Sequence, residues 1–262
     1  MNAGDVDFIG AKATAEAVKV VVEKTMTGVG AFLEKICMPA AEELGLLMQD
    51  RVKAWRGANA AKVVEKAREH LQEAGAGDDL HAHPRIVGKI LENGSWVDAT
   101  NLQDMWGGLL ATSCTPTGTD ESNLIFANIL EQLTSIEAKI VTLVCKDAMV
   151  REHHGGLVLA DAVMLAPLAD LQDLTGVEEV SKLDIALDHL RELGLLGPSS
   201  GFNVNEGPSM MAELSPTSLC LNFYARTQGM MGDPYDFYEK ALSPDDVSLP
   251  PIDFDSLGNE VQ

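Results

Sequence analysis

Apolar residues recur every three or four positions along much of this chain, and that spacing restricts it to a mainly helical fold. Between Ala11 and Cys37 one stripe consists of Val18, Val22, Met26, Val29, Leu33 and Ile36, which share one face of a helix. Aromatic residues make up only 5% of the sequence, so the core depends on Ala, Val, Leu, Ile and Met, a mixture typical of packed helices. We therefore expect a mainly α protein.

The same spacing predicts further helices, separated by glycine, proline and Ser/Thr-rich loops. They are expected to start near residues 39, 58, 84, 98 to 100, 124, 134, 178 and 215. The helix from residue 39 carries Trp55 on its apolar side, and Thr134 with Glu137 matches a capping box. Ser215 and Pro216 match an N-cap followed by proline at the first helical position.

The chain divides into four parts, of which the third resembles a winged helix. Residues 1–76 form amphipathic N-terminal helices, and residues 77–133 form a central helical block, so that these two parts make a multi-helix bundle. In residues 134–228 a helix at 178–193 is followed by candidate strands at 201–206 and 210–214 and by a last helix, which predicts a winged-helix-like subdomain with a short β-hairpin. Residues 229–262 are rich in Pro and Asp without periodicity, so we expect an acidic, largely extended or disordered tail.

Charge separates these parts and argues against a nucleic-acid partner. The formal net charge is −21. Residues 1–76 hold 10 basic and 11 acidic side chains, whereas residues 77–262 hold 9 and 29. The helix at 178–193 would read DNA in a winged helix, yet segment 178–195 has five acidic side chains against Lys182 and Arg191. Because nucleic acids attract basic surfaces, we expect no binding to them.

Several features predict a cytoplasmic protein. No apolar run approaches the roughly 20 residues that cross a bilayer, and MNAGDVDFIG lacks the basic region of a secretory signal. Cys37, Cys114, Cys145 and Cys220 lie far apart without a C-x-x-C motif, so we expect free, structural thiols.

No catalytic or metal-binding motif is recognisable. His81 and His83, like His153 and His154, lack the helical spacing and the partner ligands of a zinc site. The sequence contains no glycine-rich phosphate loop and no serine or cysteine nucleophile with a recognisable base. We expect no metal and no cofactor, and a non-enzymatic role is favoured. A metal-dependent hydrolase that uses scattered acidic residues is an alternative.

The few aromatic residues are the candidate interface. Trp106 is predicted to lie in the core because Leu102, Leu109 and Leu110 share its helix face. Trp96 follows a helix stop and is expected to be more exposed. Tyr235, Phe237 and Tyr238 make the acidic tail a second candidate contact surface. The candidate interface is thus Trp96, Trp106, Tyr235, Phe237 and Tyr238.

Residues 83–145 contain the runs HPRIVGKILENGSWVDATNLQDMWGGLLATSC and FANILEQLTSIEAKIVTLVC, and LGLL and LSPTSL follow further on. In these runs the chain resembles the abortive-infection alpha family of bacterial phage-defence proteins. The resemblance extends over about residues 40–228, and Gly94, Gly107, Gly108 and the acidic tail depart from the pattern. It implies a helical fold and a role in defence in which infection triggers dormancy or death of the cell, but it supplies no active-site residues.

The leading hypothesis is therefore a phage-defence protein that acts through contacts with a protein partner, either phage-encoded or from the host. Self-association is left open. In the alternative, the N-terminal amphipathic helices associate with a membrane or perturb it.

Overall fold

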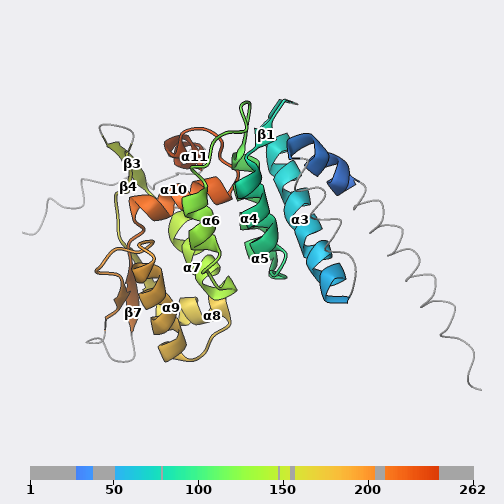
Figure 1. Ribbon diagram of the computed structural model, residues 1–262. Helices are drawn as coiled ribbons and strands as arrows, with labels where there is room; N and C mark the ends of the chain where they lie inside the picture. The colour runs from blue at the N-terminus through green and yellow to red at the C-terminus, as the bar shows by residue number, and fades with distance from the viewer. Residues whose placement is uncertain are drawn as a thin grey trace, which may run out of the picture.

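The computed structural model describes residues 28–37, 51–77, 79–146, 148–153, 157–203 and 210–241. Most of these residues are helical (Figure 1). A helix spans residues 28–36. The labelled helices are α3 (Arg51–Glu73), α4 (Pro84–Gly94), α5 (Thr100–Thr112), α6 (Leu124–Leu130), α7 (Ser135–Lys146), α8 (Leu168–Thr175), α9 (Val180–Glu192), α10 (Ser218–Thr227) and α11 (Pro234–Ala241).

Helix α5 lies at the centre of the packing, in contact with α3, α4, α6, α7 and α10. Two consecutive glycines on α5 allow this crowding. A Cβ atom at Gly107 would lie 2.4 Å from the Cβ of Lys66 on α3, and one at Gly108 would lie 2.0 Å from the carbonyl oxygen of Thr227 on α10. Such distances exclude any side chain, so the two neighbouring helices approach the α5 backbone itself.

Within the described ranges, three small antiparallel sheets accompany the helices. Strands β1 (His81–Ala82) and β2 (Cys114–Thr115) pair, and β3 (Val150–His153) forms a hairpin with β4 (Leu157–Ala160). The third sheet has the order β5-β7-β6, with β7 (Met211–Leu214) between β5 (Met164–Pro167) and β6 (Gly201–Phe202). In its register Leu165 faces Glu213 on one side of β7, and Gly201 faces Glu213 on the other.

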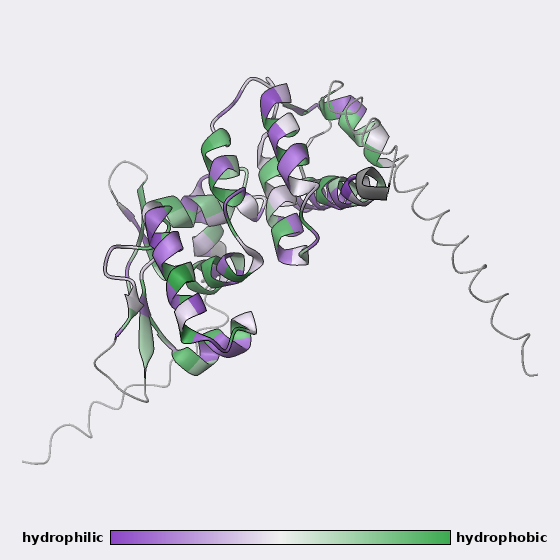
Figure 2. Ribbon diagram, turned by 60° about the horizontal axis from the view of Figure 1, so that its bottom comes forward, coloured by the Kyte–Doolittle hydropathy of each residue, from purple (hydrophilic) through white to green (hydrophobic). Residues whose placement is uncertain are grey.

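The buried apolar residues form one cluster that joins the helices. It includes Val29, Leu33 and Ile36, the part of the N-terminal stripe that falls within the described residues. Figure 2 shows that apolar and polar residues occupy different sides of most helices, as expected for amphipathic helices around a shared core. The first half of the stripe and the predicted helix start at Pro39 lie outside the described residues.

Most predicted helices are confirmed, and the differences have local causes. Helix α3 runs through Gly57, where we predicted a break, because this glycine is buried and packing outweighs its low helix propensity. Helix α10 begins two residues later than predicted. Thr217 is its N-cap and accepts a hydrogen bond from the amide of Cys220 at 3.1 Å, whereas Pro216 forms an isolated β-bridge with Leu196.

The tail differs from the prediction at its start. Residues Pro234–Ala241 form α11, whose Tyr238 is 1% exposed and donates a hydrogen bond from its hydroxyl to the carbonyl oxygen of Leu221 at 2.9 Å. This aromatic anchor holds the helix against α10. The remainder of the predicted tail, residues 242–262, lies outside the described residues.

Candidate interaction surface

Two tryptophans lie together on the surface, although they are far apart in the sequence. Trp55 on α3 is 41% exposed, and Trp96, just after α4, is 53% exposed. Their ring centroids are 6.3 Å apart at an interplanar angle of 58°, a favourable tilted arrangement. The guanidinium carbon of Arg56 lies 4.2 Å from the centroid of the Trp96 ring, within the range of a cation–π interaction. We call Trp55, Arg56 and Trp96 the tryptophan patch.

Polar contacts fix the patch to the core beneath it. Arg56 forms an ion pair with Glu92 at 3.0 Å and donates a hydrogen bond from Nε to the Ser95 hydroxyl at 3.0 Å. Ser95 is fully buried, and its carbonyl oxygen accepts a hydrogen bond from the amide of Asn59 at 3.2 Å.

Gln103 extends this buried network. Its side-chain amide donates to the Asn59 side chain at 3.3 Å and to the carbonyl oxygen of Val97 at 2.8 Å. The loop that carries Trp96 is therefore tied to α3 and α5 on both sides of the tryptophan. Because the buried Ser95, Asn59 and Gln103 hold Arg56 and the loop of Trp96 through hydrogen bonds, the patch is preorganised, which reduces the entropy lost when a partner binds.

Trp106 has a different role from Trp96. It is 1% exposed, as predicted from its apolar helix face. A Cβ atom at Gly94 would lie 3.2 Å from Val63 and 3.4 Å from the Trp106 ring, so the glycine leaves space for that ring. Trp106 is a core residue that supports the loop of Trp96 from inside.

The aromatic residues of α11 are mostly turned inward. Tyr238 is buried, and Phe237 is half-buried with its ring edge-on to Tyr238 and Tyr224, at centroid distances of 5.0 and 5.8 Å. Tyr235 is also partly buried against the core. The structure thus separates the five predicted interface residues: it exposes Trp96, buries Trp106 and Tyr238, and partly buries Phe237 and Tyr235.

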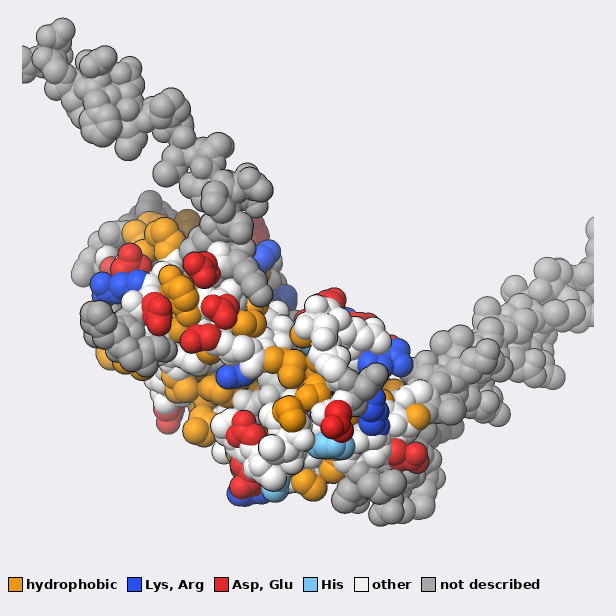
Figure 3. All heavy atoms as spheres, turned by 90° about the horizontal axis from the view of Figure 1, so that it is seen from above, with side chains coloured by type: hydrophobic (Ala, Val, Ile, Leu, Met, Phe, Trp, Pro, Cys, Tyr) orange, Lys and Arg blue, Asp and Glu red, His pale blue; other side chains and the backbone are white. Residues whose placement is uncertain are grey.

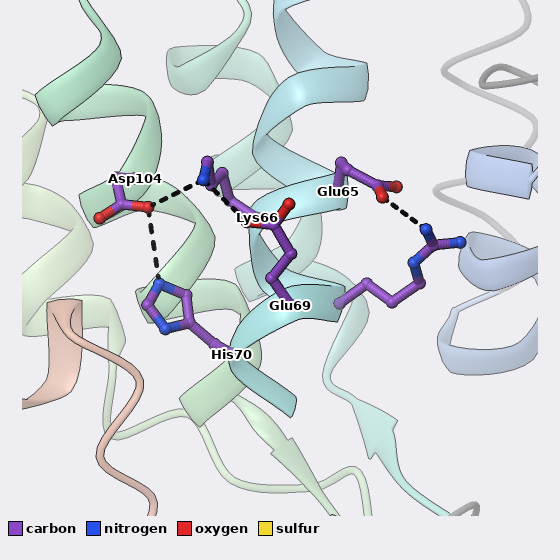
Figure 4. A network of polar contacts seen from close by, with 6 residues as sticks. Glu65, Lys66, Glu69, His70 and Asp104 are labelled. Carbon is purple, nitrogen blue, oxygen red and sulfur yellow. Dashed lines mark hydrogen bonds and ion pairs between the residues drawn. The ribbon is translucent and has the colours of Figure 1, made fainter. Parts of the chain in front are cut away.

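A second polar network lies between α3 and α5. Figure 4 shows Lys66 and His70 of α3 directed toward Asp104 of α5. The distances to Asp104 are 3.7 Å from the Lys66 ammonium and 3.9 Å from Nε2 of His70, and Lys66 also pairs with Glu69 at 2.7 Å. The hydrogen bond to Glu69 raises the pKa of Lys66, and Asp104 adds to this effect. These contacts join two helices and contain no nucleophile, so we regard them as structural.

The residues that could bind a metal do not converge. In the described ranges, no group of three or more His, Cys, Asp or Glu side chains could hold a metal ion. His83 instead caps α4, where its Nδ1 accepts a hydrogen bond from the amide of Arg85 at 3.3 Å. His81 lies 3.3 Å from Asp79. His153 ends β3, and His154 lies outside the described residues.

The four cysteines are free, as predicted, and all four are buried. Burial, together with a smaller effect of the nearby Cys37, raises the pKa of Cys114 to about 12. The sulfur atoms of Cys145 and Cys220 lie 3.4 Å apart, and burial is the main reason that the pKa of Cys145 is far above its usual value. Because the thiolate is the reactive form, these buried thiols are poor nucleophiles.

Sequence reasoning missed two of the three residues of the tryptophan patch. Trp55 was predicted on the apolar side of its helix, and Arg56 was not considered. Trp55 is exposed because it lies with Ala54 on the outer side of α3, away from the buried Ala60, Val63 and Val64. The side chain of Arg56 is only 13% exposed. The run of 14 residues from Arg51 to Val64, with four basic and no acidic residues, was the available signal.

Other exposed apolar side chains are dispersed. Ile125, Met149, Leu157, Val163, Leu165 and Ile185 are each more than half exposed. On the face seen in Figure 3, apolar side chains occur in small groups among acidic and basic ones. Aromatic rings stacked beside an arginine distinguish the tryptophan patch from these groups, and Trp and Arg are the residues most enriched in binding hot spots.

The described structure is thus that of a mainly helical protein with small antiparallel sheets and an exposed aromatic patch. The chain belongs to the abortive infection alpha family (Abi_alpha), whose family model matches residues 56–212. This membership connects the protein with abortive-infection defence. Comparisons with curated proteins and with solved structures gave no significant match. None of the helices in the described ranges is long and apolar enough to cross a membrane.

Proposed function

We propose that this protein acts in abortive infection by binding a protein partner, phage-encoded or from the host, through the tryptophan patch. The observation that carries this proposal is the exposure of Trp55 and Trp96 side by side, with Arg56 over one ring. Exposure of two tryptophans to water is unfavourable for an isolated molecule, and their burial against a partner stabilises a complex. A rigid aromatic and arginine cluster is therefore suited to a protein contact.

The third predicted part of the chain, residues 134–228, is proposed as a winged-helix-like subdomain that also serves protein contacts. Its support is the element order α7, β3, β4, β5, α8, α9, β6, β7 and α10, in which β7 is the central strand of the β5-β7-β6 sheet. The outer side of α9 carries Asp184 and Asp188, and Ile185 is 67% exposed. An acidic surface with an apolar centre disfavours nucleic acid and is compatible with a protein partner.

We propose a cytoplasmic setting for this activity. It is supported by the four free cysteines, since a reducing compartment keeps thiols unpaired. The described residues provide no observation that favours the membrane or hydrolase alternatives.

Phage plating on bacteria that express the protein tests the main proposal. The variant Trp55→Ala/Trp96→Ala should lose protection while retaining its fold, because both side chains lie at the surface. The variant Ile125→Ala is the control, since it truncates an even more exposed apolar side chain on α6, outside both proposed contact surfaces. Circular dichroism and the Tm of each purified variant verify folding. Full protection by a folded Trp55→Ala/Trp96→Ala variant, or equal loss in the control, would refute the role of the patch.

A further inference from the structure

We propose that Cys145 and Cys220 form an oxidation site, at which hydrogen peroxide converts the two thiols into a reversible disulfide, and that α11 controls access to this site. Cys145 lies on α7 and Cys220 on α10. Neither belongs to the tryptophan patch, so the site goes beyond the proposed function and does not depend on it. Three features support it: the contact between the two sulfur atoms, their burial, and the tyrosine of α11 that packs against them.

The two thiols are in contact although 75 positions separate them in the sequence. Their sulfur atoms lie 3.4 Å apart, and the helices that carry them, α7 and α10, pack against each other. The sulfur atoms of a disulfide are about 2.05 Å apart. The pair therefore has to approach by about 1.3 Å, a change within reach of small side-chain rotations, and no atom lies between the two sulfurs.

Burial keeps the pair unreactive while the structure is closed. Cys145 and Cys220 are both 0% exposed. Burial is the main cause that raises the pKa of Cys145 well above its usual value, the contact with Cys220 acts in the same direction, and Tyr238 has a smaller opposite effect. Because the thiolate is the reactive form, oxidation requires a local opening that admits water and the oxidant.

Helix α11 is the element whose displacement opens the site. The hydroxyl of its Tyr238, which is 1% exposed, donates a hydrogen bond at 2.9 Å to the carbonyl oxygen of Leu221, the residue after Cys220. Burial raises the pKa of Tyr238, and both cysteines add to this effect, so the phenol lies beside the thiol pair. Helix α11 has eight residues, and a helix this short is not stable alone. Its position depends on the tyrosine anchor, and such elements open at a lower free energy than the core.

The oxidation balances with hydrogen peroxide, which is small and uncharged and so can enter the apolar site. One thiol loses its proton and attacks an oxygen atom of the peroxide, the O–O bond breaks, and the released hydroxide takes up that proton as water, which leaves a sulfenic acid. The second sulfur attacks the sulfenic sulfur, the S–O bond breaks, and a second water forms. Two thiols and one peroxide thus give one disulfide and two waters, and the two electrons lost by the sulfur atoms reduce the peroxide.

The disulfide would connect α7 covalently to α10, the helix whose end packs on Gly108 of α5. A cross-link between segments 75 positions apart restricts the unfolded chain. The Tm of the peroxide-treated protein without reductant should therefore exceed that of the reduced protein by about 5–10 °C. Dithiothreitol should reverse this rise by thiol–disulfide exchange. A Tm that does not rise would overturn the stabilising cross-link.

Mass spectrometry of the full-length protein tests the site directly. Reduced protein is treated with hydrogen peroxide, and the remaining thiols are alkylated before digestion without reductant. We expect linked peptides that contain Cys145 and Cys220 and are lighter by two hydrogen atoms than the two separate peptides, and the number of free thiols should fall from four to two. The matched variant Cys37→Ala/Cys114→Ala keeps the pair and should give the same linked peptides with no free thiol left.

Tyr238→Ala tests the control by α11. The rate of disulfide formation should rise at least about tenfold, because truncating a buried aromatic residue strongly favours displacement of the helix. Tyr238→Phe keeps the ring and loses only the hydrogen bond to Leu221, so its rate should lie between those of Tyr238→Ala and the wild type. Ile125→Ala, which truncates an exposed side chain on α6, should oxidise at the wild-type rate. Circular dichroism verifies that each variant is folded.

Absence of the Cys145–Cys220 linked peptides from the peroxide-treated wild type would overturn the site. Oxidation of either cysteine to a sulfinic or sulfonic acid in place of a disulfide would overturn it as well. A rate in folded Tyr238→Ala equal to that of the wild type, or an equal rise in Ile125→Ala, would overturn the control of access by α11. None of these outcomes depends on the phage-plating test, so the site and the proposed function are judged separately.

Discussion

The substitution Gly108→Ala should destabilise this protein strongly, because Gly108 lies where α5 meets the end of α10. A Cβ atom at this position would lie 2.0 Å from the carbonyl oxygen of Thr227, 2.5 Å from its carbonyl carbon and 2.9 Å from the amide nitrogen of Gly229. Carbon and oxygen approach to about 3.3 Å in close C–H···O contacts, so the end of α10 would have to move by about 1.3 Å. All three obstructing atoms belong to the backbone, and no side-chain rotation relieves the clash.

The expected loss follows from two opposing terms. Overpacking a core costs about 1–3 kcal/mol, and a backbone obstruction corresponds to the upper end of this range. Alanine gains about 1 kcal/mol over glycine in a helix interior. The net loss in the free energy of unfolding is about 2 kcal/mol, which lowers the Tm of a domain of this size by about 4–8 °C.

Differential scanning calorimetry measures this change, and α4 offers a matched control. Gly88 is an exposed helical glycine with nothing within 4 Å of an added Cβ atom. Gly88→Ala should therefore raise the Tm by about 2–4 °C, from the helix-propensity gain alone. A Tm of Gly108→Ala equal to or above that of the wild type would refute the close approach of α10 as the reason for this glycine.

Three further predictions concern the core and the helix ends. Thr134→Ala should cost about 1 kcal/mol in urea unfolding, because Thr134 caps α7; an unchanged midpoint would contradict this. Trp106→Ala should cost about 3–5 kcal/mol and Trp96→Ala less than about 1 kcal/mol, and the reverse order would show that the two tryptophans are misplaced. Burial raises the pKa of Cys114 to about 12 and the pKa values of Cys145 and Tyr238 as well. The unfolded groups ionise from about pH 8.5 to 10, so stability in the presence of a reductant should be constant below about pH 8.5 and fall as the pH rises toward 12. Cys114→Ala/Cys145→Ala should reduce that slope, and an unchanged slope would argue against these thiols as its source.

Local patterns predicted the helices well, because helix starts depend on neighbouring residues. The capping box shows this most clearly. The amide of Thr134 donates to Glu137 at 2.7 Å, the amide of Glu137 donates to the Thr134 hydroxyl at 3.3 Å, and α7 begins at Ser135. The β3–β4 hairpin was missed although a signal was present. Two four-residue runs flank a segment that contains Gly155 and Gly156, a pair typical of hairpin turns.

Contacts between distant segments were not predictable in the same way. Gly94, Gly107 and Gly108 departed from the expected family pattern, and only the structure shows what each of them contacts. Gly94 faces Val63 and Trp106, Gly107 faces α3, and Gly108 faces the end of α10. Trp55 and Trp96 are 41 positions apart, and no periodicity relates them. They meet because Gly94 lets α4 end against the α3–α5 pair, which brings Ser95 within hydrogen-bond distance of Arg56.

The glycines and the tryptophan patch therefore depend on each other. Gly107 brings α3 onto α5, Gly94 leaves room for Trp106 beneath the loop, and the buried Asn59 and Gln103 then hold that loop in a fixed position. A larger residue at Gly94 would press on the Trp106 ring at 3.4 Å and displace the loop that carries Trp96.

Gly94→Ala should consequently weaken partner binding at the patch as well as lower the Tm. Gly108→Ala, which acts on the opposite side of α5, should lower the Tm while the environments of Trp55 and Trp96 are retained. The indole N–H signals of the three tryptophans in a proton–nitrogen correlation spectrum distinguish the two cases. Movement of the Trp55 and Trp96 signals in both variants alike would show that the patch is not positioned by Gly94.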